Sequence, residues 1–373
     1  MIVLYDAQIF RQQRYGGISR YYCELATRIA RDDAAVTVRV LAPHHRNEHL
    51  AGLPAPLVVG WPSARWQRVG KFARLVARVV ERRTAAKLQP DVIHETYYKG
   101  PLLQYPGALR VSTVHDMIHE RFASHFRARD PTPEAKRRAV ARADHVICIS
   151  ECTRRDLIEF LRVPESKISV VYLGASLSPV AQPAASGGAP YLLYVGERGG
   201  YKNFLGLAAA VGASPLLRDL RIVCFGGGDL VAAEWQAIDR AGIARARIVQ
   251  CSGDDTELAR LYSGALAFVY PSLYEGFGIP PLEAMACDCP VVCSNAGSIP
   301  EVVGDAGEYF EPTDLDSMRH ALESIAGSSE LRDRLRQRGR ERRLRFSWDR
   351  CAAETLALYR RLGVEAGAAA LQT

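Results

Sequence analysis

Residues 272–286 read "SLYEGFGIPPLEAMA" and directly follow the apolar run "ALAFVYP" at 265–271. A short apolar run beside a glycine-containing turn indicates a buried strand, and a double proline suits the first turn of a helix. The stretch therefore predicts a strand, a tight turn and a helix. It places Glu275 in the turn and Glu283 in the first helical turn, so that two carboxylates border the end of a strand.

Apolar runs of strand length recur on both sides of this stretch and alternate with segments of helix length. The first half contains "MIVLYD", "VTVRVLAP", "DVIHET", "RVSTVHD" and "HVICIS"; the second half contains "YLLYVGE", "LRIVCFGGG", "ARIVQCSG", "ALAFVYPS" and "CPVVCSN". This alternation predicts parallel strands joined by crossover helices on both faces of a sheet. We predict an α/β fold class, with two doubly wound Rossmann-like domains facing a central cleft in which ligands bind.

The boundary between the two domains is predicted from composition. The uncharged segment "SLSPVAQPAASGGAP" at 176–190 is rich in Pro, Ser, Ala and Gly, as linkers are. We therefore expect an N-terminal domain at residues 1–175 and a C-terminal domain at 191–346. Residues 347–373 are typical of an amphipathic helix, which we expect to pack back on the N-terminal domain.

Length and composition describe a globular protein of two ordinary domains, with 373 residues, 48% hydrophobic and 24% charged. No apolar stretch approaches the roughly 18 to 20 residues that cross a bilayer, and the start "MIVLYDAQIF" does not resemble a signal peptide. The nine cysteines lie mostly in apolar runs without metal-site spacing. We expect buried, reduced thiols in a cytoplasmic protein.

The net charge of +7 is modest, but basic residues concentrate at 61–83, "WPSARWQRVGKFARLVARVVERR". Arg and Lys alternate there with Trp, Phe, Leu and Val at helical spacing. Such a helix can lie on an anionic membrane surface, which would make the protein peripheral on the inner face of the cell membrane. The alternative is an ordinary amphipathic helix with a solvated basic face. No stacking-aromatic module accompanies the charge, so we expect no nucleic acid partner.

A glycine-containing segment follows the first strand of each half. In "YVGERGGYKNF" (194–204), Arg198 and Lys202 stand where cations and backbone N–H groups can reach a diphosphate. In "RYGGISRYYCELA" (14–26), Gly16 and Gly17 precede a helix, so a bare backbone can approach a phosphate. The alternatives are solvated cations beside a turn and a flexible helix start. The second segment is not a full GxGxxG fingerprint, which argues against a nicotinamide enzyme.

These motifs together resemble a known family. The segment "YEGFGIPPLEAMACDCPVVCSNAGSIPEVVGDAG" (274–307) closely resembles the donor-site segment of family-four glycosyltransferases, retaining enzymes of the GT-B fold with paired Glu residues eight positions apart. "YGGISRY", "VSTVHDMIHE" and "VGERGGYKNF" fall in the order that the family requires. The resemblance spans most of the chain, is strongest from 191 to 312, and extends to bacterial surface-polysaccharide transferases.

The resemblance implies an acceptor-side N-terminal domain and a C-terminal domain that binds a nucleotide sugar. It implies that Arg198 and Lys202 bind the nucleotide diphosphate, that Glu275 contacts sugar hydroxyls and that Glu283 contacts the ribose. The resemblance also implies that Gly276 binds the donor and that the backbone amides of Phe277, Gly278 and Ile279 face it.

In the N-terminal half, the resemblance implies that the loop of Gly16 and Gly17 approaches the phosphate of the transferred sugar. His115, in "STVHD", matches a family histidine near the reacting sugar, with Asp116 and His119 as neighbours. A histidine that merely satisfies the end of a strand is the alternative. The expected catalytic residues are His115, Arg198, Lys202 and Glu275.

Two segments depart from the usual pattern of the family. "VVYLGAS" stands where many members have an Asn-Gly pair, and "QCSGDDTEL" replaces a glycine-led loop that helps to seat the base. These departures put recognition of the base in doubt, but not the reaction class. No DxD pair is placed at a donor site, so we expect no essential metal and no cofactor, since cations and helix N-termini can stabilise the departing diphosphate.

The expected reaction is transfer of a hexosyl group, with retention, from a GDP- or UDP-sugar to a saccharide acceptor that can be lipid-linked. GDP-mannose or a deoxy derivative is preferred slightly, and the expected process is synthesis of O-antigen (lipopolysaccharide), capsule or exopolysaccharide. One alternative is another GT-B enzyme, such as a sugar-nucleotide epimerase or a phosphorylase. The other is a non-catalytic, nucleotide-sugar-binding membrane scaffold, for which the basic helix is the supporting feature.

Overall fold

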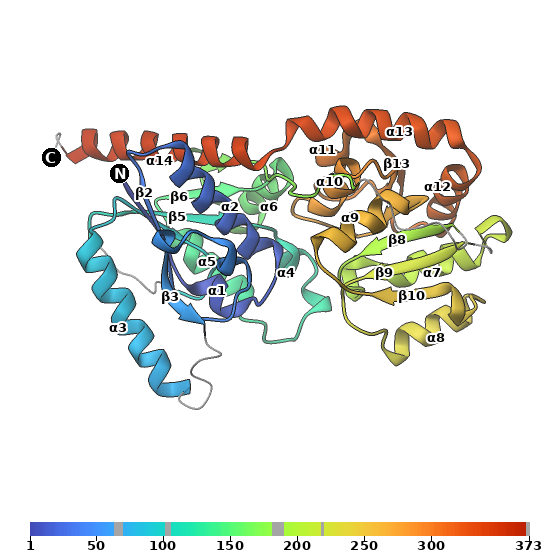
Figure 1. Ribbon diagram of the computed structural model, residues 1–373, viewed down its shortest axis with the longest axis horizontal. Coiled ribbons are helices and arrows are strands. Elements are labelled where there is room, and N and C mark those ends of the chain that lie inside the picture. The colour runs from blue at the N-terminus through green and yellow to red at the C-terminus, as the bar shows by residue number, and fades with distance from the viewer. Residues whose placement is uncertain (63–69, 101–105, 181–189, 218–219, 371–373) are drawn as a thin grey trace. The chain divides into compact units, whose positions relative to one another are not determined.

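The computed structural model describes residues 1–62, 70–100, 106–180, 190–217 and 220–370, and the chain forms two compact units (Figure 1). Unit 1 comprises residues 1–121, 126–173 and 348–373, and unit 2 comprises residues 122–125 and 174–347. The chain thus leaves unit 1 after Leu173 and re-enters it at Trp348. Most of the expected linker, residues 181–189, lies outside the described residues.

Unit 1 is built on a parallel sheet, in which the described residues form seven strands in the order β3-β2-β1-β4-β5-β6-β7. The strands are β1 (Ile2–Tyr5), β2 (Thr37–His45), β3 (Val58–Pro62), β4 (Val92–Glu95), β5 (Leu109–Val114), β6 (His145–Cys148) and β7 (Ile168–Val170). The order reverses at β1, which pairs in parallel with both β2 and β4. Such a reversal is the signature of a doubly wound sheet, so the predicted fold of this half is confirmed.

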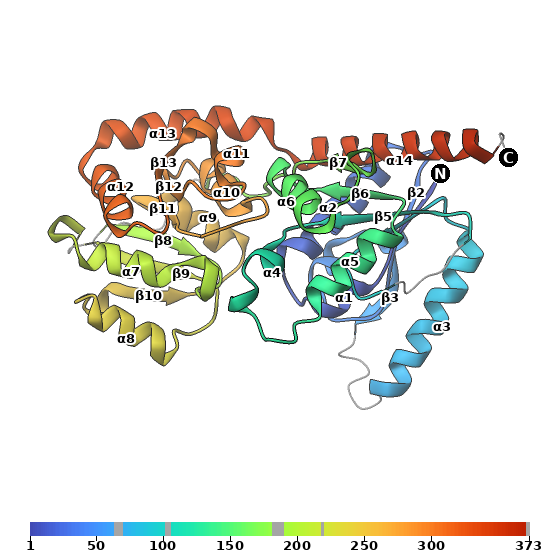
Figure 2. The same ribbon diagram turned by 180° about the vertical axis from the view of Figure 1, so that it is seen from behind.

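Helices cover both faces of the first sheet, because right-handed crossovers that run in opposite directions from β1 leave their helices on opposite sides (Figures 1 and 2). The helices of unit 1 are α1 (Gln8–Gln12), α2 (Gly17–Asp32), α3 (Gly70–Leu88), α4 (Ile118–Arg121), α5 (Thr132–Arg142), α6 (Glu151–Leu161) and α14 (Trp348–Ala370). Short 3₁₀ turns lie at His49–Gly52, Ala55–Leu57 and Glu165–Lys167.

The C-terminal helix α14 packs on α2 and reaches the interior of unit 1 through Tyr359. The Tyr359 hydroxyl lies 2.6 Å from Nδ1 of His94 on β4 and 3.3 Å from the hydroxyl of Tyr5 on β1. Nε2 of His94 lies 2.8 Å from Oγ1 of Thr113 on β5. Both ring nitrogens of a fully buried histidine are therefore partnered, and the partners join the last helix of the chain to three neighbouring strands.

Unit 2 repeats the same architecture with a second parallel sheet, ordered β10-β9-β8-β11-β12-β13 within the described residues. The strands are β8 (Tyr191–Val195), β9 (Arg221–Phe225), β10 (Ile248–Cys251), β11 (Ala267–Tyr270), β12 (Val291–Ser294) and β13 (Gly307–Phe310). The order reverses between β8 and β11, so the loops that follow these two strands separate in opposite directions. A crevice at such a switch point is where α/β sheets bind ligands.

The helices of unit 2 are α7 (Phe204–Gly212), α8 (Ala232–Arg240), α9 (Asp255–Gly264), α10 (Ile279–Ala286), α11 (Ile299–Val303), α12 (Leu315–Gly327) and α13 (Ser329–Arg342). Helices α7, α8, α12 and α13 pack apolar side chains into a core of the second sheet that contains Phe204, Leu322 and Ile325. Short 3₁₀ turns lie at Gly200–Lys202, Pro215–Leu217, Arg245–Arg247, Gly304–Ala306 and Arg343–Arg345, and a further one lies at Ala123–His125.

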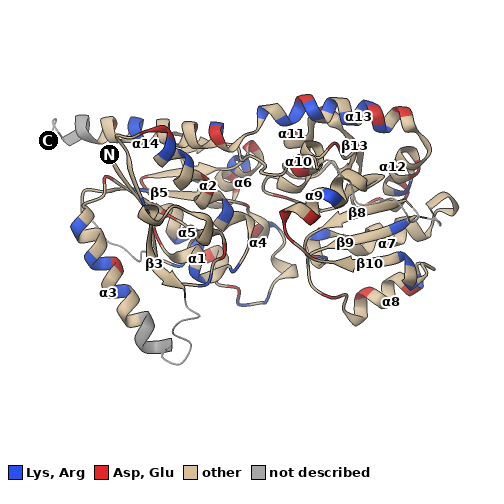
Figure 3. Ribbon diagram, viewed as in Figure 1, with Lys and Arg blue, Asp and Glu red and all other residues tan. Residues whose placement is uncertain are grey.

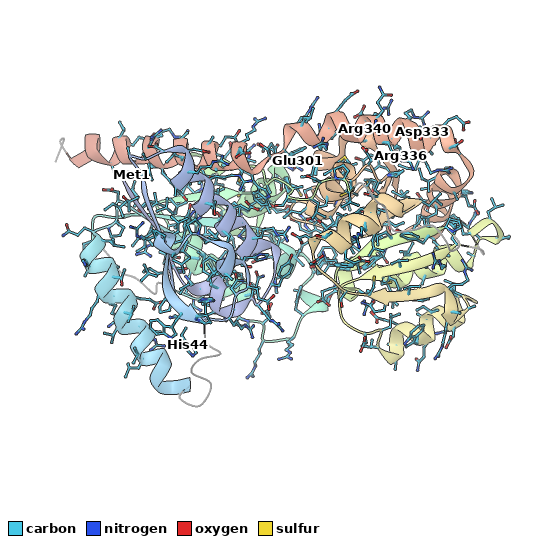
Figure 4. The ribbon with its side chains drawn as sticks, in the orientation of Figure 1. Met1, His44, Glu301, Asp333, Arg336 and Arg340 are labelled. Atoms are coloured by element: carbon cyan, nitrogen blue, oxygen red, sulfur yellow. The ribbon has the colours of Figure 1, made fainter. Side chains whose placement is uncertain are left out.

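Helix α13 is attached to the end of α10 by two arginines. Arg336 and Arg340 both lie on α13 (Figure 4). Nε of Arg340 donates to the carboxylate of Asp288 at 2.7 Å, and Nε of Arg336 donates to the carbonyl oxygen of the same residue at 3.2 Å. Asp288 follows α10 in the left-handed conformation, with φ of 57°. The arginines thus hold the chain where α10 ends and the turn to β12 begins.

None of the nine cysteines forms a disulfide bond and eight of them are buried, as predicted from their apolar surroundings. No helix in the described part of the chain is long and apolar enough to cross a membrane.

The buried histidines of unit 1 predict a stability that depends on pH. Burial lowers the pKa of His94 to about 3 and that of His115 to about 4, so both are neutral in the folded protein, whereas in the unfolded chain they take up protons below about pH 6.5. The unfolded state then binds more protons, and the free energy of unfolding falls as the pH drops from 7 to 5. Each histidine contributes about 1.4 kcal/mol per pH unit in the lower part of this range.

Urea denaturation at several pH values measures this dependence. His94→Gln should lower the free energy of unfolding at pH 7 and make its pH dependence shallower. His320→Gln, at an exposed position of α12, controls for the loss of a histidine. If the free energy of unfolding of His94→Gln depended on pH as steeply as that of the unmodified protein, His94 would not be a source of that dependence.

Candidate active site

The carboxyl ends of β8 and β11 bring two predicted motifs together in unit 2. The two strands pair in parallel through Leu193 and Phe268, so the loop after β8 lies beside the turn after β11. Nζ of Lys202, from the first loop, lies 2.7 Å from Oε1 of Glu275, in the second. Residues 73 positions apart in the sequence thus form an ion pair at the switch point of the sheet.

The ion pair is largely screened from solvent, because the Lys202 side chain is 21% exposed and that of Glu275 is 9% exposed. Two aromatic rings lie beside the ammonium group, with the Tyr201 centroid at 5.2 Å and the Tyr270 centroid at 5.8 Å. Burial, and then the neighbouring Glu275 carboxylate, raise the pKa of the Tyr270 hydroxyl. The Tyr270 hydroxyl therefore stays protonated beside the Glu275 carboxylate. The Lys202 ammonium group makes cation–π contacts with the rings of Tyr201 and Tyr270.

The Glu275 turn is held from behind by residues that sequence reasoning did not single out. Gly297 has φ of 61°, and a Cβ there would lie 2.9 Å from both the nitrogen and the oxygen of Glu275. The hydroxyl of the fully buried Ser298 lies 2.9 Å from the carbonyl oxygen of Glu275 and 2.7 Å from that of Phe277. The signal in the sequence was "NAGS" (295–298), where only glycine tolerates both the close approach and the left-handed backbone.

Helix α10 begins directly after the turn, with Gly278 as its N-cap at φ of 112° and Ile279 as its first residue. Pro280 and Pro281 have no N–H, so within the first turn of α10 the backbone donors are those of Gly278 and Ile279. Glu283 is buried on α10, but it is the fifth residue of the helix, so the prediction that it lies in the first helical turn was wrong. Burial raises the pKa of Tyr262 on α9, and the Glu283 carboxylate is the next largest cause of that rise.

Arg198, which the resemblance assigns to the diphosphate, is surrounded by protein acceptors. Its side chain is 2% exposed, and every nitrogen of the guanidinium donates to protein oxygens. Nε donates to Glu234 at 3.1 Å, and Nη1 donates to the Gln250 side chain at 3.0 Å and to Gly226 O at 3.1 Å. Nη2 donates to the carbonyl oxygens of Gly227, Gly228 and Asp229 at 3.2, 2.8 and 3.0 Å. The five N–H groups are thus satisfied by protein oxygens, and the assignment of Arg198 to the diphosphate stays a prediction.

The glycine turn of unit 1 lies at the start of α2, as predicted, with Gly16 as the N-cap and Gly17 as the first helical residue. The Gln13 side chain accepts from the backbone N–H of Ser19 at 3.2 Å, and a Cβ on Gly16 would lie 2.7 Å from the same oxygen. One orphan donor of the helix start is therefore already capped by a side chain. A residue larger than glycine would displace that cap.

His115 directly follows β5 and is buried, with its ring edge-to-face against Tyr21 at 5.5 Å. Burial lowers its pKa to about 4, so the imidazole is neutral at pH 7. Nε2 is buried and has no hydrogen-bond partner. A neutral imidazole with an unused nitrogen can donate to or accept from a hydroxyl group, depending on its tautomer.

The segment after His115 is organised by a lysine that the sequence did not reveal. Lys136, on α5, is 1% exposed, and its Nζ donates to the carbonyl oxygen of Asp116 and to the carboxylate of Glu120, both at 2.7 Å. His119 Nδ1 lies 2.5 Å from the Asp130 carboxylate. Asp116 and His119 thus lie near His115 in the chain, but each is engaged by a different partner.

No group of three or more His, Cys, Asp or Glu side chains within the described residues is arranged to hold a metal ion.

The close approach at Gly297 predicts a large effect of a small change. Gly297→Ala should lower the free energy of unfolding by roughly 1–3 kcal/mol, because the methyl group meets the Glu275 peptide and the backbone conformation disfavours alanine. Gly327→Ala is the matched control, since a Cβ there meets nothing within 4 Å. Urea denaturation that shows equal stability for the two variants would contradict the proposed constraint.

Comparisons with known proteins agree with the two-unit fold. Residues 15–178 match the family described as Glycosyltransferase Family 4, and residues 180–342 match Glycosyl transferases group 1. The chain is 32% identical over 294 residues to O-antigen chain mannosyltransferase B of Escherichia coli, covering 71% of this chain and 74% of that protein. It is 30% identical over 230 residues to O-antigen chain mannosyltransferase RfbU of Salmonella typhimurium, covering 62% of this chain and 63% of that protein.

Among solved structures, sucrose-phosphate synthase from Thermosynechococcus elongatus is similar with a TM-score of 0.76 and 22% identity, over 98% of this chain and 99% of that one. At this identity the likeness concerns the fold alone. The fold agrees with the two family matches, and the first mannosyltransferase shares almost a third of its residues over most of its length with this chain. The chain therefore belongs to the glycosyltransferases of the GT-B fold that join a family-4 N-terminal domain to a group-1 C-terminal domain.

Proposed function

We propose that this glycosyltransferase transfers a hexosyl group, with retention at the anomeric carbon, from a nucleoside-diphosphate sugar to a saccharide acceptor. The observation that carries the proposal is the Lys202–Glu275 ion pair, which stands at the switch point of the second sheet beside the start of α10. The cation suits the diphosphate, and the carboxylate suits sugar hydroxyls. The backbone donors at residues 276–279 suit the charge that develops on the leaving group.

The remaining residues take roles that fit their surroundings. Glu283, buried beside Tyr262, accepts from the ribose hydroxyls, and the neutral His115 hydrogen-bonds a sugar hydroxyl through its unused nitrogen. Gly16 and Gly17 keep the backbone at the start of α2 bare enough for a phosphate to approach. Arg198 is left out of the set of ligands, because its N–H groups already have protein partners.

The proposed chemistry is front-face transfer. The bond between the anomeric carbon and the diphosphate oxygen breaks, the acceptor oxygen bonds to the same face of that carbon, and the acceptor proton passes to the departing phosphate. This path needs positioning more than a protein base. Lys202 and the backbone donors stabilise the charge that accumulates on the diphosphate, so the proposal includes no essential metal and no cofactor.

The preferred donor is GDP-mannose or a related deoxy sugar, and the acceptor is a growing surface polysaccharide. The names of the two O-antigen chain mannosyltransferases support a mannosyl group and a polysaccharide acceptor. UDP-hexoses remain the alternative donors, because "QCSGDDTEL" departs from the pattern usual near the base. A thermal-shift screen of GDP-, UDP-, ADP- and dTDP-sugars identifies the donor, since a ligand of the folded state raises the melting temperature.

A transfer assay with the donor so identified tests the function, with mannosyl-terminated oligosaccharides as acceptors. Nuclear magnetic resonance should show the anomeric configuration of the donor retained in the product. Conversion of the sugar without an acceptor would indicate an epimerase, and a reaction that requires inorganic phosphate would indicate a phosphorylase. Binding of the nucleotide sugar without turnover across a wide acceptor panel would favour a scaffold.

Glu275→Gln should keep the fold and lower kcat/KM about 10- to 100-fold, because the side chain keeps its shape while a charge-assisted hydrogen bond to the sugar is lost. Glu341→Gln, an exposed change on α13, is the matched control and should leave kcat/KM unchanged. An unchanged kcat/KM in Glu275→Gln would remove this carboxylate from the site.

The helix α3 supports the proposal that an anionic membrane surface is a partner. Of the basic segment at 61–83, residues 63–69 lie outside the described structure. From residue 75 onward, the exposed side chains of α3 are both apolar and basic. Leu75 is 59% and Val79 is 42% exposed, and Arg78, Arg82 and Arg83 are exposed beside them. Figure 3 shows that basic residues recur along the described part of α3. The inward side carries Ala77, Ala85 and Glu81, which lies 2.9 Å from Arg11.

This distribution differs from that of an ordinary amphipathic helix, whose apolar residues face the core. Here leucine and valine point to solvent between arginines, and the acidic residue of α3, Glu81, is buried on the other side. A face of this kind suits the boundary of an anionic bilayer, where apolar side chains insert and arginines meet phosphate head groups. We assign α3 to the inner face of the cell membrane on this basis.

Neutralising Arg78, Arg82 and Arg83 to glutamine should release the protein from anionic vesicles, at about 1 kcal/mol for each charge, and binding by the unmodified protein should fall steeply with salt. Transfer to a soluble acceptor should be unaffected. The matched control neutralises three exposed arginines of another surface, Arg334, Arg343 and Arg345. Sedimentation without salt-dependent association of the unmodified protein would support the solvated-face alternative instead.

A further inference from the structure

Arg198 connects the ends of three neighbouring strands. It stands in the loop after β8, and its acceptors include the loop after β9 and Gln250 on β10. Gln250 strengthens the same junction, because its Nε2 donates to Gly226 O at 2.8 Å. Glu234 joins the junction to α8, since its second oxygen accepts from the backbone N–H of Val231 at 2.8 Å.

The loop after β9 has an unusual backbone that depends on this cation. Gly226, Gly227 and Gly228 all lie in the left-handed region, with φ of 80°, 71° and 68°. A cation attracts carbonyl oxygens and repels N–H hydrogens, so the guanidinium orients successive peptide planes with their oxygens inward. The N–H groups of these peptides are therefore directed away from Arg198.

The junction is also closely packed. A Cβ on Gly227 would lie 2.6 Å from the carbonyl oxygen of Gly196 and 2.9 Å from Nη1 of Arg198. The charge of Arg198 is balanced by Glu234 at 3.1 Å, inside a site from which solvent is excluded. The cation consequently has neither a spare donor nor an uncompensated charge to offer a diphosphate.

The place of the loop in the sheet indicates what it borders. Lys202 and Glu275 mark the switch point between β8 and β11, whereas β9 and β10 follow β8 on the side away from β11. A nucleoside joined to a diphosphate at the switch point must extend to one side of it, and the aligned peptides of residues 226–229 lie at the strand ends on the β9 side. Aligned N–H groups and glycine backbone suit the close approach of the base of the nucleoside.

We propose that Arg198 is a positioning residue for the nucleoside of the donor, and not a ligand of its diphosphate. It holds Gly226, Gly227 and Gly228 in the left-handed conformation that shapes the nucleoside side of the site. This inference rests on the proposed function, because it assumes a nucleotide-sugar donor.

Nucleotides that differ only in phosphate count test the assignment. Isothermal titration with GMP and GDP, or with UMP and UDP if the unmodified protein prefers uridine, compares the unmodified protein with Arg198→Lys. Lysine keeps the charge but lacks the planar guanidinium group, so it cannot donate to the same set of carbonyl oxygens. We expect Arg198→Lys to lower the affinity for the nucleoside monophosphate and for the nucleoside diphosphate by the same factor, about tenfold. KM for the donor should rise more than kcat falls.

Two further variants keep the test decisive if Arg198→Lys folds poorly. Gly227→Ala disturbs the same loop while leaving Arg198 in place. It should lower the affinity for both nucleotides by the same factor. Lys202→Met removes the cation that we assign to the diphosphate. It should lower the affinity for the nucleoside diphosphate more than that for the monophosphate. Thermal unfolding of each variant separates loss of the fold from loss of binding.

Each outcome decides between named alternatives. If Arg198→Lys lowered the affinity for the nucleoside diphosphate alone, Arg198 would be a direct phosphate ligand, and the inference would be overturned. A lowered melting temperature with unchanged affinities in both loop variants would reduce the junction to a structural role and overturn it as well. Failure of the unmodified protein to bind any nucleotide would instead overturn the proposed function, and the inference with it.

Discussion

The parallel pairing of β8 with β11 is the contact on which the candidate site depends. These strands are not consecutive in the chain, and their pairing creates the point at which the second sheet reverses its order. The loops after them separate in opposite directions, which leaves room for a ligand between them. Lys202 and Glu275 meet there because the two strands end at the same edge of the sheet, and Gly297 and Ser298 then hold the Glu275 turn in place.

Several buried charges are compensated by ion pairs and hydrogen bonds at the ends of strands. Glu95, whose side chain is fully buried at the end of β4, pairs with Arg110 at 2.6 Å and with Arg142 at 2.5 Å. Lys136 is satisfied by Asp116 and Glu120, and Arg198 by Glu234 and a set of carbonyl oxygens. An isolated charge in such surroundings would cost several kcal/mol, so each pair commits its loop to one conformation. Both units thus use ionic contacts to order the loops at strand ends.

The chain's local pattern was sufficient to predict the elements around the site. Strand-length apolar runs, a helix that opens on a double proline and glycines at the turns each follow from backbone sterics and from the period of the apolar residues. The doubly wound sheets, the strand, turn and helix around Glu275 and the placement of Gly16 and Gly17 at a helix start were therefore predicted correctly. The proximity of Lys202 to Glu275 was implied by the resemblance to the family, since no local rule joins residues so far apart.

The sequence by itself determined the class of fold, the family and the side chains available for chemistry, because these depend on residue types and short spacings. Only the tertiary structure decided which way the side chains face. Arg198 looked like a cation free for phosphate, but its acceptors come from segments about 30 to 50 residues further along the chain, and no local pattern links them to it. Lys136, Ser298 and Tyr359 acquire their roles in the same way, since the partners of a buried polar group are chosen by the packing of strands and helices distant in sequence.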